Sequence, residues 1–424
     1  MKSFDEIRTL LIEQRGEISG ADLGIEREKL AEITKYKDTP FPVIISGLRR
    51  AGKSTLLAQL AHKLYPNNEY FYVNFEDDRF LSFRVSDFTR LHELLIELFG
   101  NQKIFMFDEI QNIEGWEMFV NRMIRGGYKF YITGSNASLL SKELGTKLTG
   151  RYMPIELFPF SFKEYLQFRK ILLPDITRLT TVQKGELRKT VSEYIQKGGI
   201  PEALQYQQLP IHKRLYDAII DRDIGARYKL AETKPLRELA FYLLSNIPSL
   251  VSYNKLKELL QLGSVNTVST YIEYLQASWL FFVLNRYSYS VKKQQIANKK
   301  VYGIDTGLTK SVAFSFSEDK GKFLENTVFL KLRRLYEDNK EIYYYKTETG
   351  KEVDFYLPKQ KAFLQVSESL ADPTTKEREV RALLDSMKEV NDSTGMIITE
   401  DEKDTLMLYG KTIVVLPVYE WLLL

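Results

Sequence analysis

The sequence has no cysteine and only three histidines among its 424 residues. The absence of cysteine excludes disulfides, thiolate metal sites and cysteine nucleophiles, and so few histidines argue against a multi-histidine metal centre. Long apolar runs are also missing, since SWLFFVL at 278–284 is far shorter than the ~20 residues that cross a membrane. The N-terminal MKSFDEIRTLLIEQ lacks the uninterrupted apolar segment of a signal peptide. We therefore expect a soluble, cytoplasmic protein.

The chain also has little excess charge of either sign. Its 60 lysines and arginines stand against 56 aspartates and glutamates, which gives a net charge of +4. Any surface for nucleic acid must then come from local clustering of basic residues. The length corresponds to about three domains at ~150 residues each.

Short apolar runs alternate with helical patterns in the first part of the chain. After a charged helical segment at 1–40, we expect strands in PFPVIISG, EYFYVNF, KIFMFDE, KFYITGS and YMPIELF. This alternation predicts a parallel, doubly wound sheet in a core domain at 41–159. Residues 160–245 have an almost wholly helical pattern, 246–310 predict short helices followed by strands, and 320–424 predict a further α/β unit.

Residues 47–54, GLRRAGKS, match the pattern G-x-x-x-x-G-K-[ST] between an expected strand and an expected helix. In such a phosphate loop backbone N–H groups point at phosphate oxygens, Lys53 reaches the β and γ phosphates, and Ser54 can ligate Mg²⁺. The sequence therefore predicts a site for ATP and Mg²⁺. The residues expected to contact the nucleotide here are Gly47, Leu48, Arg49, Arg50, Ala51, Gly52, Lys53, Ser54 and Thr55.

The second half of this site is predicted in IFMFDE, where an apolar strand ends in two acids. Asp108 would hold Mg²⁺ through water, and Glu109 would polarise the attacking water. Glu109 is the residue that favours ATP hydrolysis over binding alone. Lys53, Asp108 and Glu109 are therefore expected to be catalytic.

The motifs GLRRAGKST, YVNFEDDRF, FMFDEIQN, YITGSNASLL and LTGRY follow one another along the chain. With them the chain resembles the AAA+ superfamily, and more narrowly the prokaryotic ATP-binding proteins that carry a C-terminal domain of unknown function. The resemblance implies that Asn74 restrains Glu109 and that Ser135 or Asn136 senses the γ phosphate. Each of these polar residues could equally be a strand-end cap.

Two further positions take a role from the resemblance. Arg151, in LTGRY, lies where AAA+ proteins carry an arginine finger, which would stabilise the transferring phosphoryl group. Acting in trans it would require a homo-oligomer, and a structural ion pair is the alternative. The turn at Gly198, Gly199 and Pro201 resembles a lid turn that packs against the base or the β phosphate, and is otherwise an ordinary helix break.

Residues 252–275 predict a helix-turn-helix around Gly263, in which Val265, Val268, Ile272 and Leu275 share the apolar face of the second helix. Two strands, LFFVLNRY and KKVYGID, follow, and SYSVKKQQIAN joins them as the wing of a winged helix would. Basic residues gather there without any acid, a composition that suits DNA phosphates. They are Arg286, Lys292, Lys293, Lys299 and Lys300. A packing module without DNA contact is the alternative.

The C-terminal segment combines a helix carrying Glu325 with a hairpin carrying Asp354. This order resembles the restriction-endonuclease-like fold, whose metal-binding signature is an aspartate followed by Glu-x-Lys on the next strand. Gln365 and Ser367 stand where that glutamate and lysine would be. The resemblance therefore implies a vestigial metal site at Glu325 and Asp354, retained for packing or docking.

Together these features predict an α/β protein with a P-loop AAA+-like parallel sheet, a helical lid, a winged helix and a degenerate nuclease-like domain. Its expected function is Mg²⁺-dependent ATP hydrolysis by a switch or loader acting on DNA. An ATP-driven nuclease is one alternative, for which Lys351 or Lys376 would have to replace the missing lysine. The other is a signalling ATPase whose C-terminal domains bind protein partners without DNA.

Overall fold

The computed structural model describes residues 4–137, 148, 150–313, 320–391 and 394–424. The end of YITGSNASLL and residue 149 of LTGRY lie outside this range. The chain forms two compact units, Met1–Phe158 and Pro159–Leu424. Among the described helices, none has the length and apolar character needed to span a membrane.

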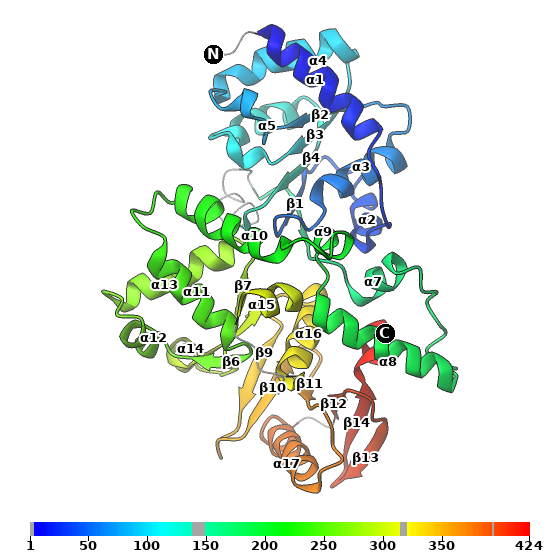
Figure 1. Ribbon diagram of the computed structural model, residues 1–424, viewed down its shortest axis with the longest axis vertical. Coiled ribbons are helices and arrows are strands. Elements are labelled where there is room, and N and C mark those ends of the chain that lie inside the picture. Colours follow the sequence, from blue (N-terminus) through cyan, green and yellow to red (C-terminus); the bar gives the residue numbers. More distant parts are fainter. Residues whose placement is uncertain (1–3, 138–147, 149, 314–319, 392–393) are drawn as a thin grey trace. The chain divides into compact units, whose positions relative to one another are not determined.

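The first unit is built on a parallel sheet of five strands in the order β2-β3-β4-β1-β5 (Figure 1). They are β1 (Val43–Gly47), β2 (Phe71–Asn74), β3 (Ile104–Asp108), β4 (Lys129–Gly134) and β5 (Met153–Leu157). Every pairing is parallel, so all the strands end at the same edge. These are the strands expected from the sequence, because parallel strands buried on both faces are almost continuously apolar.

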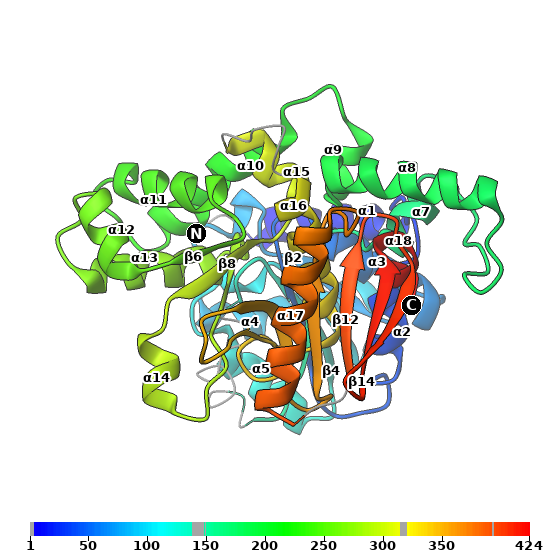
Figure 2. The same cartoon turned by 90° about the horizontal axis from the view of Figure 1, so that it is seen from below.

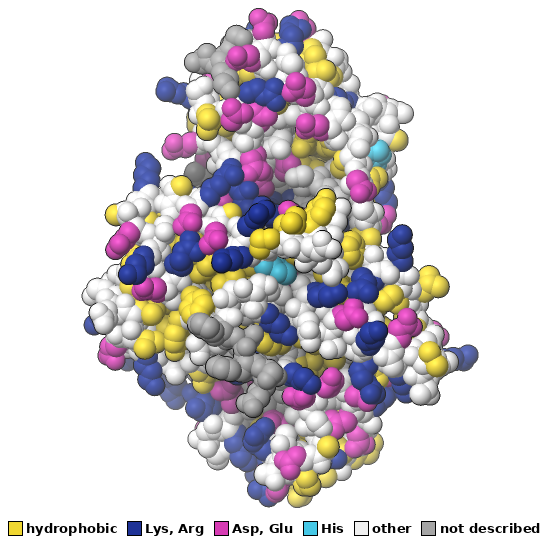
Figure 3. Space-filling model, viewed as in Figure 1, with side chains coloured by type: hydrophobic (Ala, Val, Ile, Leu, Met, Phe, Trp, Pro, Cys, Tyr) yellow, Lys and Arg dark blue, Asp and Glu magenta, His cyan; other side chains and the backbone are white. Residues whose placement is uncertain are grey.

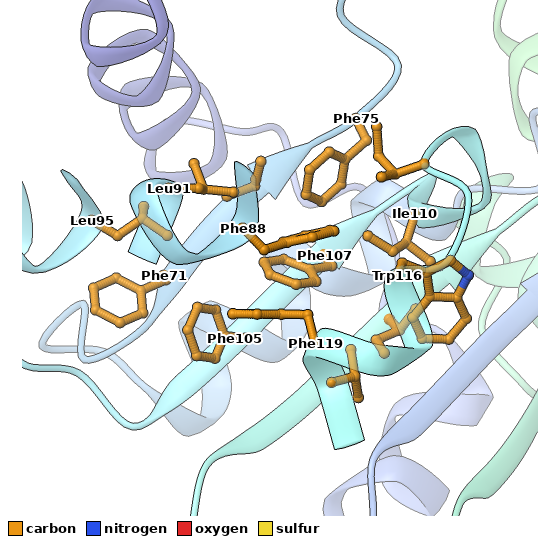
Figure 4. Packing of buried hydrophobic residues seen from close by; sticks show 14 of the residues in the cluster. Phe71, Phe75, Phe88, Leu91, Leu95, Phe105, Phe107, Ile110, Trp116 and Phe119 are labelled. Carbon is orange, nitrogen blue, oxygen red and sulfur yellow. The ribbon is translucent and has the colours of Figure 1, made fainter. Parts of the chain in front are cut away.

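Helices cover both faces of this sheet, with α2 and α3 on one face and α1, α4 and α5 on the other. Their bounds are α1 (Phe4–Ser19), α2 (Glu28–Thr34), α3 (Lys53–Leu64), α4 (Phe88–Phe99) and α5 (Trp116–Arg125). Under α4 and α5 the core is largely aromatic and includes Phe71, Phe107 and Phe119 (Figure 4). Phe105 and Phe130 stack with ring centroids 4.8 Å apart. This packing fixes β3, and with it the acids at its end.

The second unit begins with the helices predicted for 160–245. They are α7 (Phe162–Phe168), α8 (Thr181–Lys197), α9 (Pro201–Gln205), α10 (Ile211–Ala218), a π-helical segment (Ile219–Ala226) and α11 (Lys234–Ser245). The turn between α8 and α9 contacts Asp305, which precedes α15 (Thr306–Val312). The Asp305 carboxylate accepts hydrogen bonds from Gly199 N (2.6 Å) in the turn and from Leu308 N (2.8 Å). The GGIP turn is thereby tied to the start of α15.

A three-stranded antiparallel sheet follows, in the order β6-β8-β7. The elements are β6 (Ser249–Val251), α12 (Tyr253–Leu259), α13 (Val265–Ala277), β7 (Phe281–Leu284), α14 (Val291–Ile296) and β8 (Lys299–Gly303). Val268, Ile272 and Leu275 of α13 are buried, as their spacing predicts, whereas Val265 at the start of the helix is only partly buried. The connection between β7 and β8 contains α14, which the sequence did not predict. Helix α11, from the range expected for the lid, packs against α13.

The chain ends in a mixed sheet of six strands in the order β13-β14-β12-β11-β10-β9. The strands are β9 (Tyr343–Lys346), β10 (Glu352–Leu357), β11 (Ala362–Val366), β12 (Thr394–Thr399), β13 (Asp404–Leu408) and β14 (Lys411–Pro417). The helices are α16 (Lys320–Leu335), α17 (Pro373–Glu389) and α18 (Val418–Leu423). Helix α17 lies across one face of the sheet, where Leu383 and Met387 join its hydrophobic core (Figure 2). The expected hairpin is formed by β10 and β11, which pair antiparallel.

The contact between Gly198 and Asp305 gives a first test of the second unit. At Gly198 φ is +74°, and a Cβ would lie 2.1 Å from Asp305 Oδ1. We expect Gly198→Ala to lower the free energy of unfolding by roughly 3 kcal/mol, because both the backbone strain and the overlap are destabilising. The matched control is Gly185→Ala in α8, where a Cβ meets no atom within 4 Å. It should stabilise the helix by ~0.5–1 kcal/mol. Equal thermal melting of the two variants would contradict this account.

Candidate functional site at the carboxyl edge of the first sheet

The phosphate loop leaves β1 and leads directly into α3 (Figure 1). Arg50 (φ 65°) and Gly52 (φ 93°) have left-handed backbones, which Gly52 adopts without strain because it has no Cβ. Such residues turn neighbouring N–H groups to one side and shape an anion-binding concavity at the start of a helix. Before the loop, Ser46 Oγ donates to Asn136 O (2.8 Å), which joins β1 to the residues after β4. The loop is therefore shaped for a phosphate group.

Lys53 is the first residue of α3 and is almost fully buried. Its Nζ donates to Gly47 O (3.2 Å) and Leu48 O (3.3 Å), and it lies 3.3 Å from Glu109 Oε1. The three donors of the ammonium group thus match three partners inside the site. Phosphate oxygens bound in the loop would compete with these partners.

Asp108 ends β3 and is fully buried. Its carboxylate accepts hydrogen bonds from Tyr72 Oη (3.3 Å), from Thr133 Oγ1 and from the hydroxyl of Ser54. Burial and the charge of Glu109 raise the pKa of Asp108, whereas the hydrogen bonds from Ser54 and Thr133 act in the opposite direction. Since Ser54 and Asp108 meet here, they present the oxygen ligands that Mg²⁺ prefers.

Glu109 follows with a left-handed backbone (φ 50°), an uncommon conformation for a residue that has a Cβ. Gln111 Nε2 donates to Glu109 Oε2 and contacts Ser135 Oγ at 3.4 Å. Burial acts to raise the pKa of Glu109, but the charge of Lys53 and the hydrogen bond from Gln111 outweigh it. The pKa therefore lies below its usual range, and the carboxylate is ionised at neutral pH.

The expected role of Asn74 is corrected by these contacts. Asn74 Oδ1 accepts from Glu76 N (2.9 Å) and so caps the turn after β2. Gln111, two residues after Glu109, is the amide that holds Glu109. The sequence shows Gln111 in FDEIQN, but its spacing does not reveal which of several polar residues turns toward the acid.

Arg27 supports the phosphate loop from the segment between α1 and α2. Its Nη1 donates to Ala51 O (2.6 Å) and its Nη2 to Phe158 O (2.7 Å), while its backbone N donates to Gln59 Oε1 (3.2 Å). Its guanidinium is almost fully buried, so these bonds form away from solvent. No local pattern in the sequence marks this contact, because its partners lie far away along the chain.

Two expected nucleotide contacts remain predictions. Arg151 precedes β5, whose first residue Met153 pairs with Val43 at the start of β1. The phosphate loop follows Gly47 at the other end of β1, roughly 13 Å further at ~3.3 Å per residue. Arg151 therefore lies toward the edge opposite the loop, and its expected role as an arginine finger stays a prediction. Pro201 belongs to the second unit, where it opens α9.

The basic cluster of the predicted wing is only partly exposed. Lys292 and Lys293 lie exposed on α14. Arg286 and Lys299 are half-buried and donate to backbone carbonyl groups. Lys300 is buried, which corrects its expected role in DNA contact. Figure 3 shows basic and acidic side chains interspersed over the visible face, as the net charge of +4 leads one to expect.

Lys300 instead joins three carboxylates that we call the carboxylate cage: Glu325 of α16 with Glu352 and Asp354 of β10. Lys300 Nζ lies 3.0 Å from Glu325 Oε1 and 2.8 Å from both Glu352 Oε1 and Asp354 Oδ1. Tyr302 Oη also donates to Glu325 Oε1 (2.7 Å). Burial and the charge of Asp354 raise the pKa of Glu325 to about 7, although Lys300 acts to lower it.

The hairpin residues stand beside the cage. Gln365 Oε1 accepts from Asp354 N (3.2 Å), and Ser367 Oγ donates to a nearby carbonyl (3.0 Å). Lys351 and Lys376 pair with other aspartates, so neither supplies the missing lysine. Within the described part of the chain, no group of three His, Cys, Asp or Glu residues has a metal-binding arrangement. The expected metal position at Glu325 and Asp354 is therefore taken by the ammonium group of Lys300.

Three family matches cover most of the chain. A family described as AAA domain matches residues 39–166. A domain of unknown function, DUF8612, matches residues 188–319, and another, DUF4143, matches residues 320–421. A Walker-type ATPase of Pyrococcus abyssi has a similar structure with a TM-score of 0.41 and 15% identity over 68% of this chain and 95% of that one.

Relatives in sequence span almost the full length. An uncharacterised protein of Methanocaldococcus jannaschii is 33% identical over 89% of this chain and 87% of its own length. An uncharacterised protein of Haemophilus influenzae is 30% identical over 94% of this chain and 98% of its own length. The chain therefore belongs to a family of AAA-domain ATPases that continue into the domains of unknown function DUF8612 and DUF4143.

Proposed function

We propose that the AAA domain hydrolyses ATP, with the phosphates in the loop Gly47–Ser54 and Glu109 as the residue that orients the attacking water. The observation that carries this proposal is the 3.3 Å pair between Lys53 and Glu109 at the phosphate loop. Binding of phosphate would draw Lys53 away and leave Glu109 ionised and facing the new ligand. A carboxylate in that position can accept hydrogen bonds from a water molecule and take its proton.

The other residues of the site hold this geometry. Gln111 fixes the Glu109 carboxylate and extends the hydrogen-bond chain to Ser135, which with Asn136 is one of the two residues expected to sense the γ phosphate. Ser54 and Asp108 would hold Mg²⁺, which supplies neutralisation of phosphate charge when it is bound. Arg151 acts in this proposal as a finger toward a neighbouring copy, so the active species would be a homo-oligomer.

We further propose that the protein acts on DNA through the segment α11–β8. The order of α11, β6, α12, α13, β7 and β8 is that of a winged helix, with α14 inserted between the last two strands, and supports this assignment. Contact with phosphates would rest on Lys292 and Lys293, since the other basic residues of the cluster are partly or fully buried. The same segment exposes Tyr289 and Ile296, which favours a protein partner as the competing function.

An ATP-driven nuclease is not supported by the contacts of the cage. All three donors of the Lys300 ammonium group are directed to carboxylates, which leaves none for a hydroxide or a leaving group. The strand order of the C-terminal sheet, with α16 before β9–β11 and α17 before β12, still supports a scaffold like that of restriction endonucleases.

Substitution of Glu109 tests the catalytic assignment. We expect Glu109→Gln to lower ATP hydrolysis by ~10²- to 10⁴-fold, the range for one general base. Its affinity for ATP should be unchanged or higher, because Lys53 loses a competing carboxylate. Lys53→Ala should lose ATP binding. Phosphate release and titration with a fluorescent ATP analogue measure the two effects separately, with Glu97→Gln in the exposed pair with Arg8 as control. Hydrolysis by Glu109→Gln at the wild-type rate would refute the assignment.

Replacement of the exposed lysines of α14 tests the DNA role. If Lys292 and Lys293 contact phosphates, changing both to alanine should weaken duplex DNA binding and reduce the salt dependence of log Kd by about two counterions. Lys299→Ala is the matched control, since Lys299 Nζ donates to Gln294 O (2.7 Å) within the protein. Fluorescence anisotropy at several salt concentrations gives both quantities. If the wild-type protein binds no DNA even at low salt, the DNA role is refuted and the function with a protein partner is favoured.

A further inference from the structure

Strand β13 forms an open edge of the six-stranded sheet, since β14 is its sole partner among the described residues. The other three edges of the two large sheets are covered or blocked. The side-chain amide of Gln14 bonds to both backbone groups of Asn74 in β2. Strand β5 contains Pro154, and β9 bonds to the segment 285–287. Such devices prevent one sheet edge from pairing with another, and within the described part of the chain β13 has none of them on its outer side.

The turn between β13 and β14 determines which backbone groups of β13 face outward. It consists of Tyr409 (φ 52°) and Gly410 (φ 70°), both with left-handed backbones, and it joins the paired residues Leu408 and Lys411. In a two-residue hairpin of this kind the residues that flank the turn form a hydrogen-bonded pair, and every second residue along the strand repeats the pattern. The even-numbered residues of β13 therefore bond to β14, and the odd-numbered ones direct their N–H and C=O groups outward.

Thr405 and Met407 are these odd-numbered residues, and both are exposed. Thr405 N donates to the side chain of its neighbour Asp404 (Oδ1, 2.8 Å), which agrees with an outward direction. Met407 is 80% exposed, and Tyr409, just beyond the strand, is 92% exposed. Helices α17 and α18 pack mainly on other strands of this sheet, α17 on β10–β12 and α18 on β12 and β14. The outer edge of β13 thus combines outward backbone groups with exposed apolar side chains, which are the features of a strand that pairs with another.

We propose that two copies of this chain associate through β13, with the two strands antiparallel and a two-fold axis at Leu406. Leu406 is the middle residue of the strand Asp404–Leu408, so this register uses the full length of the strand. Thr405 of each copy then faces Met407 of the other, and each such pair exchanges both of its N–H···O bonds. The bond from Thr405 N to its neighbour's carboxylate is replaced by a bond to a carbonyl group of the second copy. The six-stranded sheets of the two copies thereby become one continuous sheet.

The charges along β13 fit a second copy of the same strand. In this register Asp404 faces Leu408, and Leu406 faces its own copy. Lys403, just before the strand, faces the exposed ring of Tyr409. No charged residue therefore lies opposite a like charge, and apolar side chains meet one another across the contact. Because the same surface is used by both copies, the contact closes on itself and yields a dimer rather than a filament.

The absence of cysteine makes this register directly testable, because each substitution introduces a single thiol per chain. A contact through one strand is small, so the dimer should depend on protein concentration, and covalent trapping is the suitable measurement. In the proposed dimer the thiols of Leu406→Cys lie opposite each other, with ~4.5 Å between Cα atoms, which is within disulfide range. Those of Tyr409→Cys lie several residues apart, although Tyr409 is the more exposed residue. With oxidant and without nucleotide, Leu406→Cys should form a disulfide-linked dimer about ten-fold faster than Tyr409→Cys on non-reducing gels.

Proline at position 405 tests the backbone bonds of the contact. Thr405→Pro removes an outward N–H group, a change that an edge strand tolerates without loss of the fold. Added to Leu406→Cys, it should reduce cross-linking to the rate of Tyr409→Cys. The matched control is Leu172→Ser, at an apolar residue that is 91% exposed elsewhere in the same unit, and it should leave cross-linking unchanged. The proposal is overturned if Leu406→Cys and Tyr409→Cys cross-link at the same rate, or if Thr405→Pro has no effect.

A mixed pair of variants covers the case in which Leu406→Cys fails to fold, since Thr405 and Met407 are both exposed. Thr405→Cys protein mixed with size-tagged Met407→Cys protein should form the mixed disulfide faster than either forms a disulfide with itself. The reason is that like positions lie ~7–8 Å apart on the diagonal, whereas 405 and 407 lie directly opposite. Disulfides formed at random between the two proteins overturn the proposal. No sample contains ATP, and an oligomer joined through the AAA domain would not favour this pairing, so these readouts stand apart from the proposed function.

Discussion

A buried ammonium group must be surrounded by acceptors, because transfer of a charge out of water costs far more than one hydrogen bond returns. This constraint shapes both sites of the chain. Lys53 is held by two loop carbonyls and Glu109, and Lys300 by three carboxylates. The difference lies in which partners can be exchanged. Glu109 is one carboxylate at a loop shaped for phosphate, so an incoming anion can replace it. The cage around Lys300 already has more negative charge than the ammonium group neutralises, so a further anion has no place there.

Much of the first unit could be predicted from the sequence because its signals are local. Parallel strands buried on both faces appear as short apolar runs, and GLRRAGKS specifies a strand, a loop and a helix in eight residues. The acids Asp108 and Glu109 could be placed as well, since they directly follow such a run and parallel strands end at one edge. In these cases position along the chain determines position in space, and spacing alone is sufficient.

The rest depends on contacts between distant segments. Lys300 belongs by composition to a basic run, yet in β8 it shares a strand face with Tyr302, and both side chains meet Glu325. No spacing rule predicts that this face is covered by α16. The contact of Arg27 was missed for the same reason, since its partner Phe158 is the last residue of the unit in the sequence. Spacing alone could not distinguish Gln111 from Asn74 as the partner of Glu109. The backbone conformation decides which of the two side chains turns toward the acid, and the sequence does not show it.

The cage also gives the second unit a physical link between its two sheets. Helix α14, which carries the exposed Lys292 and Lys293, precedes β8 by a few residues and is tied to it by the bond from Lys299 Nζ to a carbonyl of α14. The next residue is Lys300, whose charge binds β8 to α16 and β10. The two adjacent lysines therefore hold β8 to α14 on one side and to the C-terminal sheet on the other, and the buried ion network resists separation of β8 from α16 and β10 because breaking it would leave unpaired buried charges.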